Sequence, residues 1–96
     1  MTESTMFSKP GGNRIVSDEG FSIEWGPMYV GITYIEGNQR IFVDSEGLAN
    51  GRIAVWPDTM RVVGQNTDKL DAETHSRVLE NIRLALAFQG DVIELT

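Results

Sequence analysis

The chain holds few residues that could carry out covalent or acid–base chemistry. His75 is its only histidine and it has no cysteine. This excludes disulfides, thiolate metal sites and cysteine nucleophiles, and it leaves a histidine-based acid–base pair without a second member. His75 falls on a predicted helix, four residues before Leu79, where a surface or partly packed histidine is a simpler interpretation than a catalytic one. The sequence therefore predicts neither an enzyme nor a cofactor.

Carboxylates are abundant, and two pairs of them are close in sequence. Asp44 with Glu46, and Asp68 with Asp71, could each act jointly, as paired carboxylates do in glycosidases and metal sites. Neither pair has the Asp and Gly spacing of a calcium loop, and the chain has no phosphate-binding glycine loop and no zinc motif. We therefore expect solvated loop carboxylates and no bound metal.

Tryptophan and acidic residues near strand ends are better candidates for recognition of another macromolecule. Trp56 precedes Pro57-Asp58, which predicts a turn at the end of a strand. Tryptophan is enriched in binding hot spots, although packing at the edge of the core is the simpler interpretation of both Trp25 and Trp56. The candidate partner-binding residues are Asp44, Glu46, Trp56, Asp58 and Asp68.

The charge balance indicates which partner would suit such residues. The 96 residues include 8 Lys and Arg against 14 Asp and Glu, a net charge of −6. Phosphate binding needs clustered basic side chains, so nucleic acid is not the expected ligand. An acidic chain attracts a basic protein instead, unless its acidity serves only solubility. Three arginines fall on predicted strands, where we expect ion pairs with neighbouring carboxylates rather than an anion site: Arg40, Arg52 and Arg61.

Hydrophobic periodicity predicts the elements that must position these residues. An alternating pattern of period two predicts strands, and spacings of three and four predict a helix from about Asp71 to Gln89, begun by Asp68 or Asp71 and ended at Gly90. Strands are predicted at 21–25, 28–35, 40–44, 52–56 and 91–96, and the short apolar segments 14–16 and 60–63 are candidates for further strands. A hairpin turn is predicted at 36–39 and a second turn at Pro57-Asp58. The fold class is α+β: a mostly antiparallel sheet of about five to six strands, one long C-terminal helix packed on one face, and a final strand.

The chain is long enough for one core. Residues 1–13 are polar and predict a flexible tail, in which Met6 and Phe7 are either exposed or docked at the core edge, and residues 14–96 predict a single α+β domain. No stretch approaches the ~18 apolar residues of a membrane helix, and the N-terminus has no apolar signal region. We expect a cytoplasmic protein that does not contact the membrane.

From residue 28 to the end, the chain is similar to a family of small immunity proteins from bacterial polymorphic-toxin systems of the contact-dependent inhibition type. The resemblance lies in strand Arg52–Trp56, in Met60-Arg61, in the helix segment Arg77–Arg83 and in the closing strand Val92–Leu95. The family's arginine after the central strand would correspond to Arg61, whereas residues 1–20 have no counterpart. The resemblance implies a protein that binds a cognate toxin, often a nuclease, and occludes it.

Two other classes of function stay open from the residues alone. One is a small ligand-binding or enzymatic domain, with a pocket between sheet and helix lined by His75, Tyr29 or Tyr34. The other is an oligomerising structural module that pairs two copies through an exposed strand edge. The sequence does not specify the oligomeric state, and a monomer is the simplest expectation.

Overall fold

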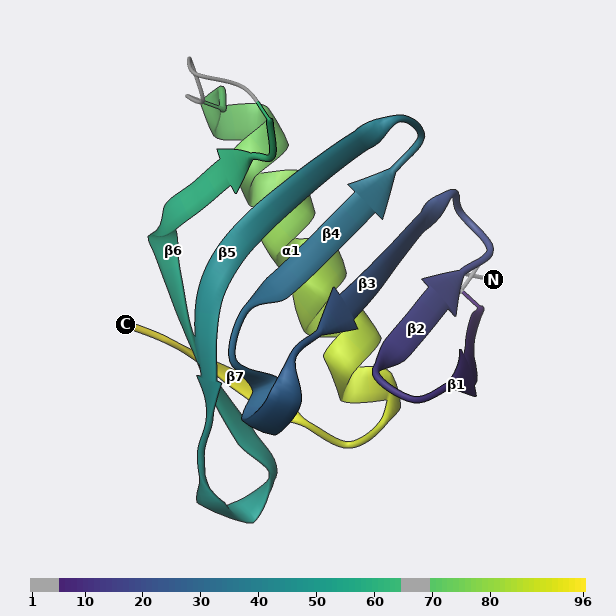
Figure 1. Cartoon of the computed structure of the whole chain (residues 1–96), viewed down its shortest axis with the longest axis vertical. Coiled ribbons are helices and arrows are strands. Elements are labelled where there is room, and N and C mark those ends of the chain that lie inside the picture. Colours follow the sequence, from purple (N-terminus) through teal and green to yellow (C-terminus); the bar gives the residue numbers. More distant parts are fainter. Residues whose placement is uncertain (1–5, 65–69) are drawn as a thin grey trace, which may run out of the picture.

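A curled sheet and a helix that packs against it make up the structure (Figure 1). The structure, a computed structural model, describes residues 6–64 and 70–96, and in these residues it has seven strands and one α-helix. The strands follow one another across the sheet in sequence order; β1 to β6 are antiparallel, and β7 lies parallel to β6. This confirms the predicted α+β class. The strands are β1 (Phe7–Gly11), β2 (Arg14–Ser17), β3 (Phe21–Trp25), β4 (Ile32–Glu36), β5 (Gln39–Gly47), β6 (Arg52–Val62) and β7 (Val92–Leu95).

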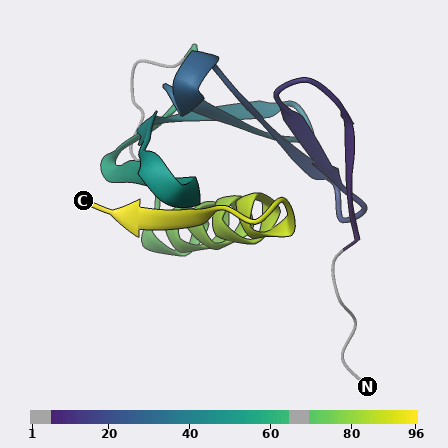
Figure 2. The same ribbon diagram turned by 90° about the horizontal axis from the view of Figure 1, so that it is seen from below.

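The helix α1 (Ala72–Phe88) lies across the concave side of the sheet (Figure 2). Its first turn is capped by the Asp71 carboxylate, which accepts from the backbone N–H of Thr74 at 2.7 Å. It ends before Gly90, whose φ of +92° suits glycine. Both helix ends lie where the sequence predicts them, with Asp71 as the cap. Among the described residues, no helix is long and apolar enough to cross a membrane.

The core fills the space between the sheet and α1. Its central side chains come from every second residue of the strands and from the apolar stripe of the helix. These are the two hydrophobic periodicities that the sequence shows, two residues for strands and three to four for the helix. Burying this much branched aliphatic surface supplies the main stabilisation of the domain. The largest side chains that are less than 2% exposed are Tyr34, Ile15, Ile23, Ile32, Ile41, Ile53, Ile82, Leu86, Val43, Val55 and Val78.

The predicted flexible tail is wrong for residues 7–11, which form the edge strand β1. Phe7 is half-buried, and its ring lies 6.1 Å from that of Phe21 and 5.7 Å from that of Phe88, measured between centroids. Polar composition suggests a tail, but β1 needs only this one apolar anchor because the other side chains of an edge strand can face water. Of the two alternatives for Phe7, docking at the core edge is the one observed.

The predicted turn at Pro57-Asp58 is also wrong, because β6 runs through it from Arg52 to Val62. Phe42 pairs with Arg61 and Asp44 with Trp56, so a short span of β5 faces a longer span of β6. The extra residues of β6 form a bulge, which accommodates the missing N–H of Pro57 without ending the strand. The two strands predicted at 52–56 and 60–63 are therefore one bent strand.

The predicted strand at 28–35 begins later, at Ile32. A 3-10 turn, η1 (Pro27–Tyr29), precedes it, with Met28 and Tyr29 in the left-handed region at φ of 56° and 60°. The loop after β5 contains a second such turn, η2 (Ala49–Gly51). The residues from 28 to 35 favour a strand, so their sequence does not predict η1. The turn forms because contacts with other segments hold its backbone, such as the hydrogen bond from Ser45 to Tyr29.

The final strand completes a crossover that the sequence leaves unassigned. After α1, β7 returns beside β6, with Ile53 opposite Ile93 and Val55 opposite Leu95. A parallel neighbour requires such a crossover, and a helix between the strands is its usual form. β6 thus lies between β5 and β7, and β7 is the last strand of the sheet.

Candidate protein-binding surface

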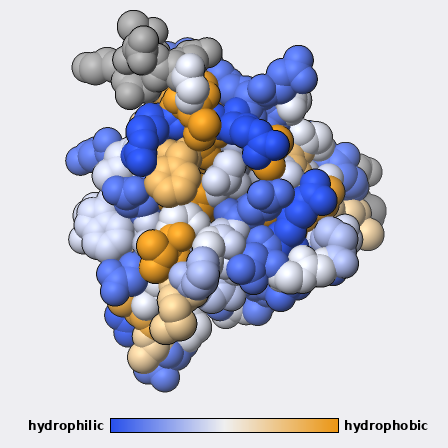
Figure 3. All heavy atoms as spheres, viewed as in Figure 1, coloured by the Kyte–Doolittle hydropathy of each residue, from blue (hydrophilic) through white to orange (hydrophobic). Residues whose placement is uncertain are grey.

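The strands β5 and β6 present two different faces. On β5, Ile41, Val43 and Ser45 point toward α1 and are buried, so Phe42, Asp44 and Glu46 point to the opposite, outer side. Trp56 and Arg61 are the β6 partners of Asp44 and Phe42 and lie on the same side. These five residues define the outer surface: Phe42, Asp44, Glu46, Trp56 and Arg61. Figure 3 looks onto this side of the sheet and shows apolar side chains gathered among hydrophilic ones.

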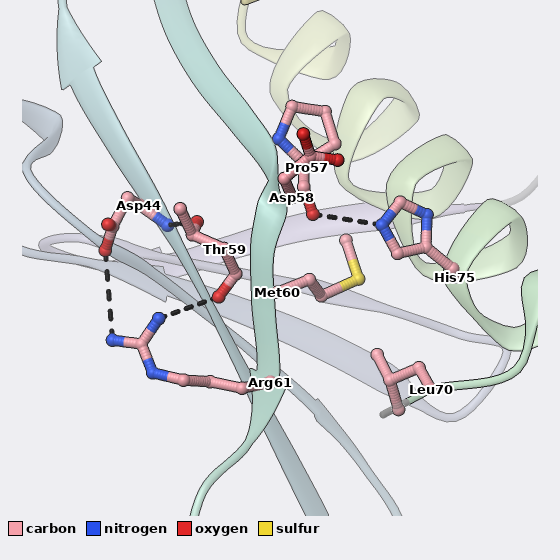
Figure 4. Close-up of a pocket in the computed structure, with 8 residues that line it drawn as sticks. All are labelled: Asp44, Pro57, Asp58, Thr59, Met60, Arg61, Leu70 and His75. Carbon is pink, nitrogen blue, oxygen red and sulfur yellow. Dashed lines mark hydrogen bonds and ion pairs between the residues drawn. The ribbon is translucent and has the colours of Figure 1, made fainter. Parts of the chain in front are cut away.

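Arg61 ties the outer surface together. Its guanidinium carbon lies 4.8 Å from the centroid of the Phe42 ring, a cation–π distance. One terminal nitrogen donates to the backbone oxygen of Thr59 at 2.7 Å, and the other lies 3.9 Å from the Asp44 carboxylate (Figure 4). Both charged side chains are about half exposed, so this ion pair orients the groups more than it stabilises the fold. This contact agrees with the expectation that the strand arginines pair with neighbouring carboxylates, as does the ion pair of Arg52 with Glu94.

Thr59 holds the β6 bulge against β5. Its hydroxyl donates to the backbone oxygen of Trp56 at 2.7 Å and accepts from the backbone N–H of Asp44 at 2.8 Å. Asp44 is an irregular position of the ladder, and Thr59 satisfies its N–H there. The backbone around Asp44 and Trp56 is therefore fixed, and two side chains with different chemistry face solvent from it.

His75 fixes the other side of the bulge. Its Nε2 lies 2.9 Å from the backbone oxygen of Pro57 (Figure 4). A carbonyl oxygen can only accept, so Nε2 carries the hydrogen. Between this contact and Arg61 lies an open hollow of about 520 Å³, with Asp58 and Leu70 also on its wall. His75 is half-buried and makes a hydrogen bond to the bulge, in agreement with its interpretation as a partly packed residue.

The structure brings most of the sequence-predicted binding residues to one region. Asp44 and Trp56 are direct cross-strand partners, Glu46 follows on β5, and Asp58 lies in the bulge two residues after Trp56. The three carboxylates are exposed and Trp56 is half-buried. Trp25 is 8% exposed and belongs to the core, whereas Trp56 is only partly packed. Asp68 lies outside the described residues.

Two members of the outer surface, Phe42 and Arg61, are absent from the predicted set. The signal for Phe42 is present, because it alternates with Ile41 and Val43, which mark the inner side. Its ring also lies over Gly31, where an added Cβ would be 2.7 Å from a ring carbon. Arg61 carries the same signal, because it lies between the buried Met60 and Val62. Its position opposite Phe42 depends on the bulge and has no local signal.

The polar residues proposed for a pocket between sheet and helix are engaged in separate contacts. The buried Tyr34 hydroxyl donates to Glu36 at 2.7 Å and accepts from Asn81 at 2.9 Å. Burial raises the pKa of Tyr34 to about 12; the Asn81 hydrogen bond opposes this shift and Glu36 adds to it. The Tyr29 hydroxyl accepts from Gln89 at 3.0 Å. These tyrosines link the sheet to α1 and the segment after it.

No three His, Cys, Asp or Glu side chains within 6–64 and 70–96 are grouped to hold a metal ion.

Comparison of the chain with protein-family models, with curated proteins and with solved structures finds no match. The interpretation of the site therefore depends on the geometry and chemistry of the outer surface.

Proposed function

We propose that this chain is an immunity protein of the cytoplasm that binds a cognate toxin domain and neutralises it by covering its active site or substrate surface. The observation that carries the proposal is the direct pairing of Asp44 with Trp56 on the solvent side of the sheet. An aromatic anchor beside carboxylates, on a backbone fixed by Thr59, combines features that protein-binding hot spots share.

The charge of the outer surface favours a basic partner. Asp44, Glu46 and Asp58 are exposed around Trp56, and Arg61 is the one basic member of the outer surface. Carboxylates at such a site would meet the Lys and Arg side chains with which a nuclease holds phosphates. The same arrangement agrees with the resemblance to polymorphic-toxin immunity proteins, in which Arg61 takes the place of the family's arginine.

The segment before β4 adds apolar area near this region. Met28 and Val30 are 78% and 58% exposed, and Val30 directly precedes Gly31, over which the Phe42 ring lies. The buried Ser45 hydroxyl donates to the backbone oxygen of Tyr29 at 2.6 Å and holds this segment to β5. Exposed apolar side chains next to a charged rim are typical of protein-interaction sites.

The test is co-expression with the product of the gene immediately upstream, with growth rescue and direct binding as readouts. Trp56→Ala should speed dissociation by about tenfold or more, because an aromatic anchor acts mainly on the lifetime of a complex. Glu46→Lys and Asp58→Lys should slow association by about tenfold at low salt. The matched control is Glu19→Lys, which changes the net charge equally but lies in the turn between β2 and β3.

Rescue by the wild type that is lost with Trp56→Ala, Glu46→Lys and Asp58→Lys, and kept with Glu19→Lys, supports both the function and the surface. Rescue that survives all three variants would place the interface elsewhere. Absence of binding and rescue by the wild type would contradict the function itself.

A further inference from the structure

The two edges of the sheet differ in how they are protected against pairing. The edge strand β1 carries Lys9 and Pro10 and has an irregular register between Ser8 and Gly11. A lysine, a proline and a bulge are devices by which natural sheets block an edge. At this edge, addition of another strand is opposed.

The opposite edge, β7, has none of these devices. Its sequence is Val-Ile-Glu-Leu, with no proline and no lysine, and its ladder with β6 is regular. The one charge, Glu94, forms an ion pair with Arg52 of β6. Val92 and Leu95 are 61% and 58% exposed, and within the described part of the chain β6 is the only strand beside β7. The outward backbone groups of β7 are therefore available to a further strand.

A groove between α1 and β7 adjoins this edge. It has a volume of about 300 Å³ and is mostly apolar, with Leu79, Ile93 and Leu95 on its walls. Glu80 and Arg83 lie along its helix side and are paired, with 2.9 Å between Arg83 Nε and Glu80 Oε1. One strand edge, one apolar groove and one charge of each sign thus occur together.

We propose that a second copy of this chain occupies this edge, with the two β7 strands antiparallel about a two-fold axis. The charges favour a second copy over other occupants, because a two-fold interface is self-complementary: residue i meets residue j, and j meets i. Glu80 and Arg83, which pair within one chain, exchange partners across the axis, so that Glu80 of each copy faces Arg83 of the other. Both apolar grooves then close over each other. A register with Ile93 opposite its own copy also keeps the two Glu94 carboxylates apart.

This dimer does not use the outer surface, so it is independent of the proposed toxin binding. Pairing at β7 extends the sheet and sets the two helices side by side on one face. The outer surfaces of both copies stay open on the other face. The dimer would therefore present two toxin-binding surfaces.

The experiment is sedimentation velocity on the full chain over a range of concentrations, with charge-exchange variants. The wild type should be dimeric at micromolar concentration. Glu80→Arg and Arg83→Glu should each be monomeric alone, because like charges then face one another across the axis. An equimolar mixture of these two variants should restore a dimer, since each unlike pair forms again.

A second pair of variants tests the strand edge without relying on the helix. Leu95→Lys should raise the dissociation constant of the dimer at least tenfold. Val63→Lys changes a similarly exposed residue that follows β6, and it should leave the dissociation constant unchanged. Circular dichroism confirms that each variant is folded. A wild-type chain that stays monomeric, including one whose edge is filled only by the toxin, would overturn the proposal. So would a dimer that survives Leu95→Lys, or failure of the mixed variants to associate.

Discussion

Met28 is a residue whose backbone and side chain are both unusual. Its φ is 56°, that of the following Tyr29 is 60°, and its side chain is 78% exposed. A left-handed conformation costs a non-glycine residue about 1 kcal/mol or more. The side chain recovers little of that cost by burial, so the strain is maintained by the contacts of its neighbours. Among these are the backbone hydrogen bond from Val30 to Pro27 and the hydrogen bond from Ser45 to the backbone oxygen of Tyr29.

Replacement of Met28 by asparagine should therefore stabilise the fold. Asparagine tolerates the left-handed region, so Met28→Asn should raise the free energy of unfolding by about 0.5–1 kcal/mol, measured by urea denaturation. Val30→Asn is the control, because Val30 is similarly exposed but has a φ of −82° and no strain to relieve. If Met28→Asn loses more stability than Val30→Asn, the Met28 side chain has a structural contact.

Tyr34 gives stability a dependence on alkaline pH. Its pKa is about 12 in the folded chain and 10.0 without the fold, so above pH 10 the unfolded chain loses this proton while the folded chain keeps it. The contribution is complete below pH 10 and is lost as pH rises through about 12, with a slope of up to about 1.4 kcal/mol per pH unit. Tyr34→Phe removes this proton. Between pH 9.5 and pH 11.5, the free energy of unfolding of the variant should therefore fall less than that of the wild type. Equal slopes for both chains would contradict this.

Among single residues, part of the outer surface could be predicted from sequence. The alternation of Ile41 and Val43 with Asp44 and Glu46 places the carboxylates away from the core, and Trp56 ends an alternating run. The sequence does not predict that Asp44 and Trp56 are opposite each other, because that register depends on the β6 bulge. The roles of Thr59 and Arg61 depend on the same irregularity, which no local periodicity encodes.

At the scale of elements, segments with strong periodicity were predictable and segments held by distant contacts were not. The helix and the β4–β5 hairpin have local signals: an apolar stripe with a cap, and a turn of Gly37 and Asn38 between alternating runs. β1 has one apolar residue in contact with the core, and β6 contains a proline. Their strand character comes from pairing with a neighbour, and pairing is not a property of the segment alone.

Phe7 tests the strand character of β1. Its ring packs against Phe21 and Phe88, so Phe7→Ala should lower the free energy of unfolding by about 1–2 kcal/mol and speed amide exchange in β2, its ladder partner. Met6→Ala is the control, because the neighbouring Met6 is 67% exposed. A flexible tail would make the two variants equal, and equal stabilities would contradict the role of β1.

At the scale of the whole molecule, the net charge of −6 acts in opposite directions on the two proposed interfaces. A basic toxin is attracted, so its association should be fastest when screening is weak. A second copy carries the same charge and is repelled, while strand pairing and apolar contact hold the dimer together. The Debye length falls from roughly 30 Å at 0.01 M salt to roughly 3 Å at 1 M, so both effects of the net charge are removed over this range.

Added salt should therefore slow toxin association by about tenfold or more and at the same time tighten the dimer. Stopped-flow mixing measures the first and sedimentation velocity the second, on the same chain and in the same buffers. Glu19→Lys lowers the net charge to about −4 without changing a residue of either interface, so it should weaken both salt responses together. A dimer that loosens with salt would mean that the exchanged Glu80–Arg83 pairs, rather than the net charge, dominate its electrostatics. Toxin association that does not change with salt would mean that apolar contact at Trp56, and not the surrounding carboxylates, selects the partner.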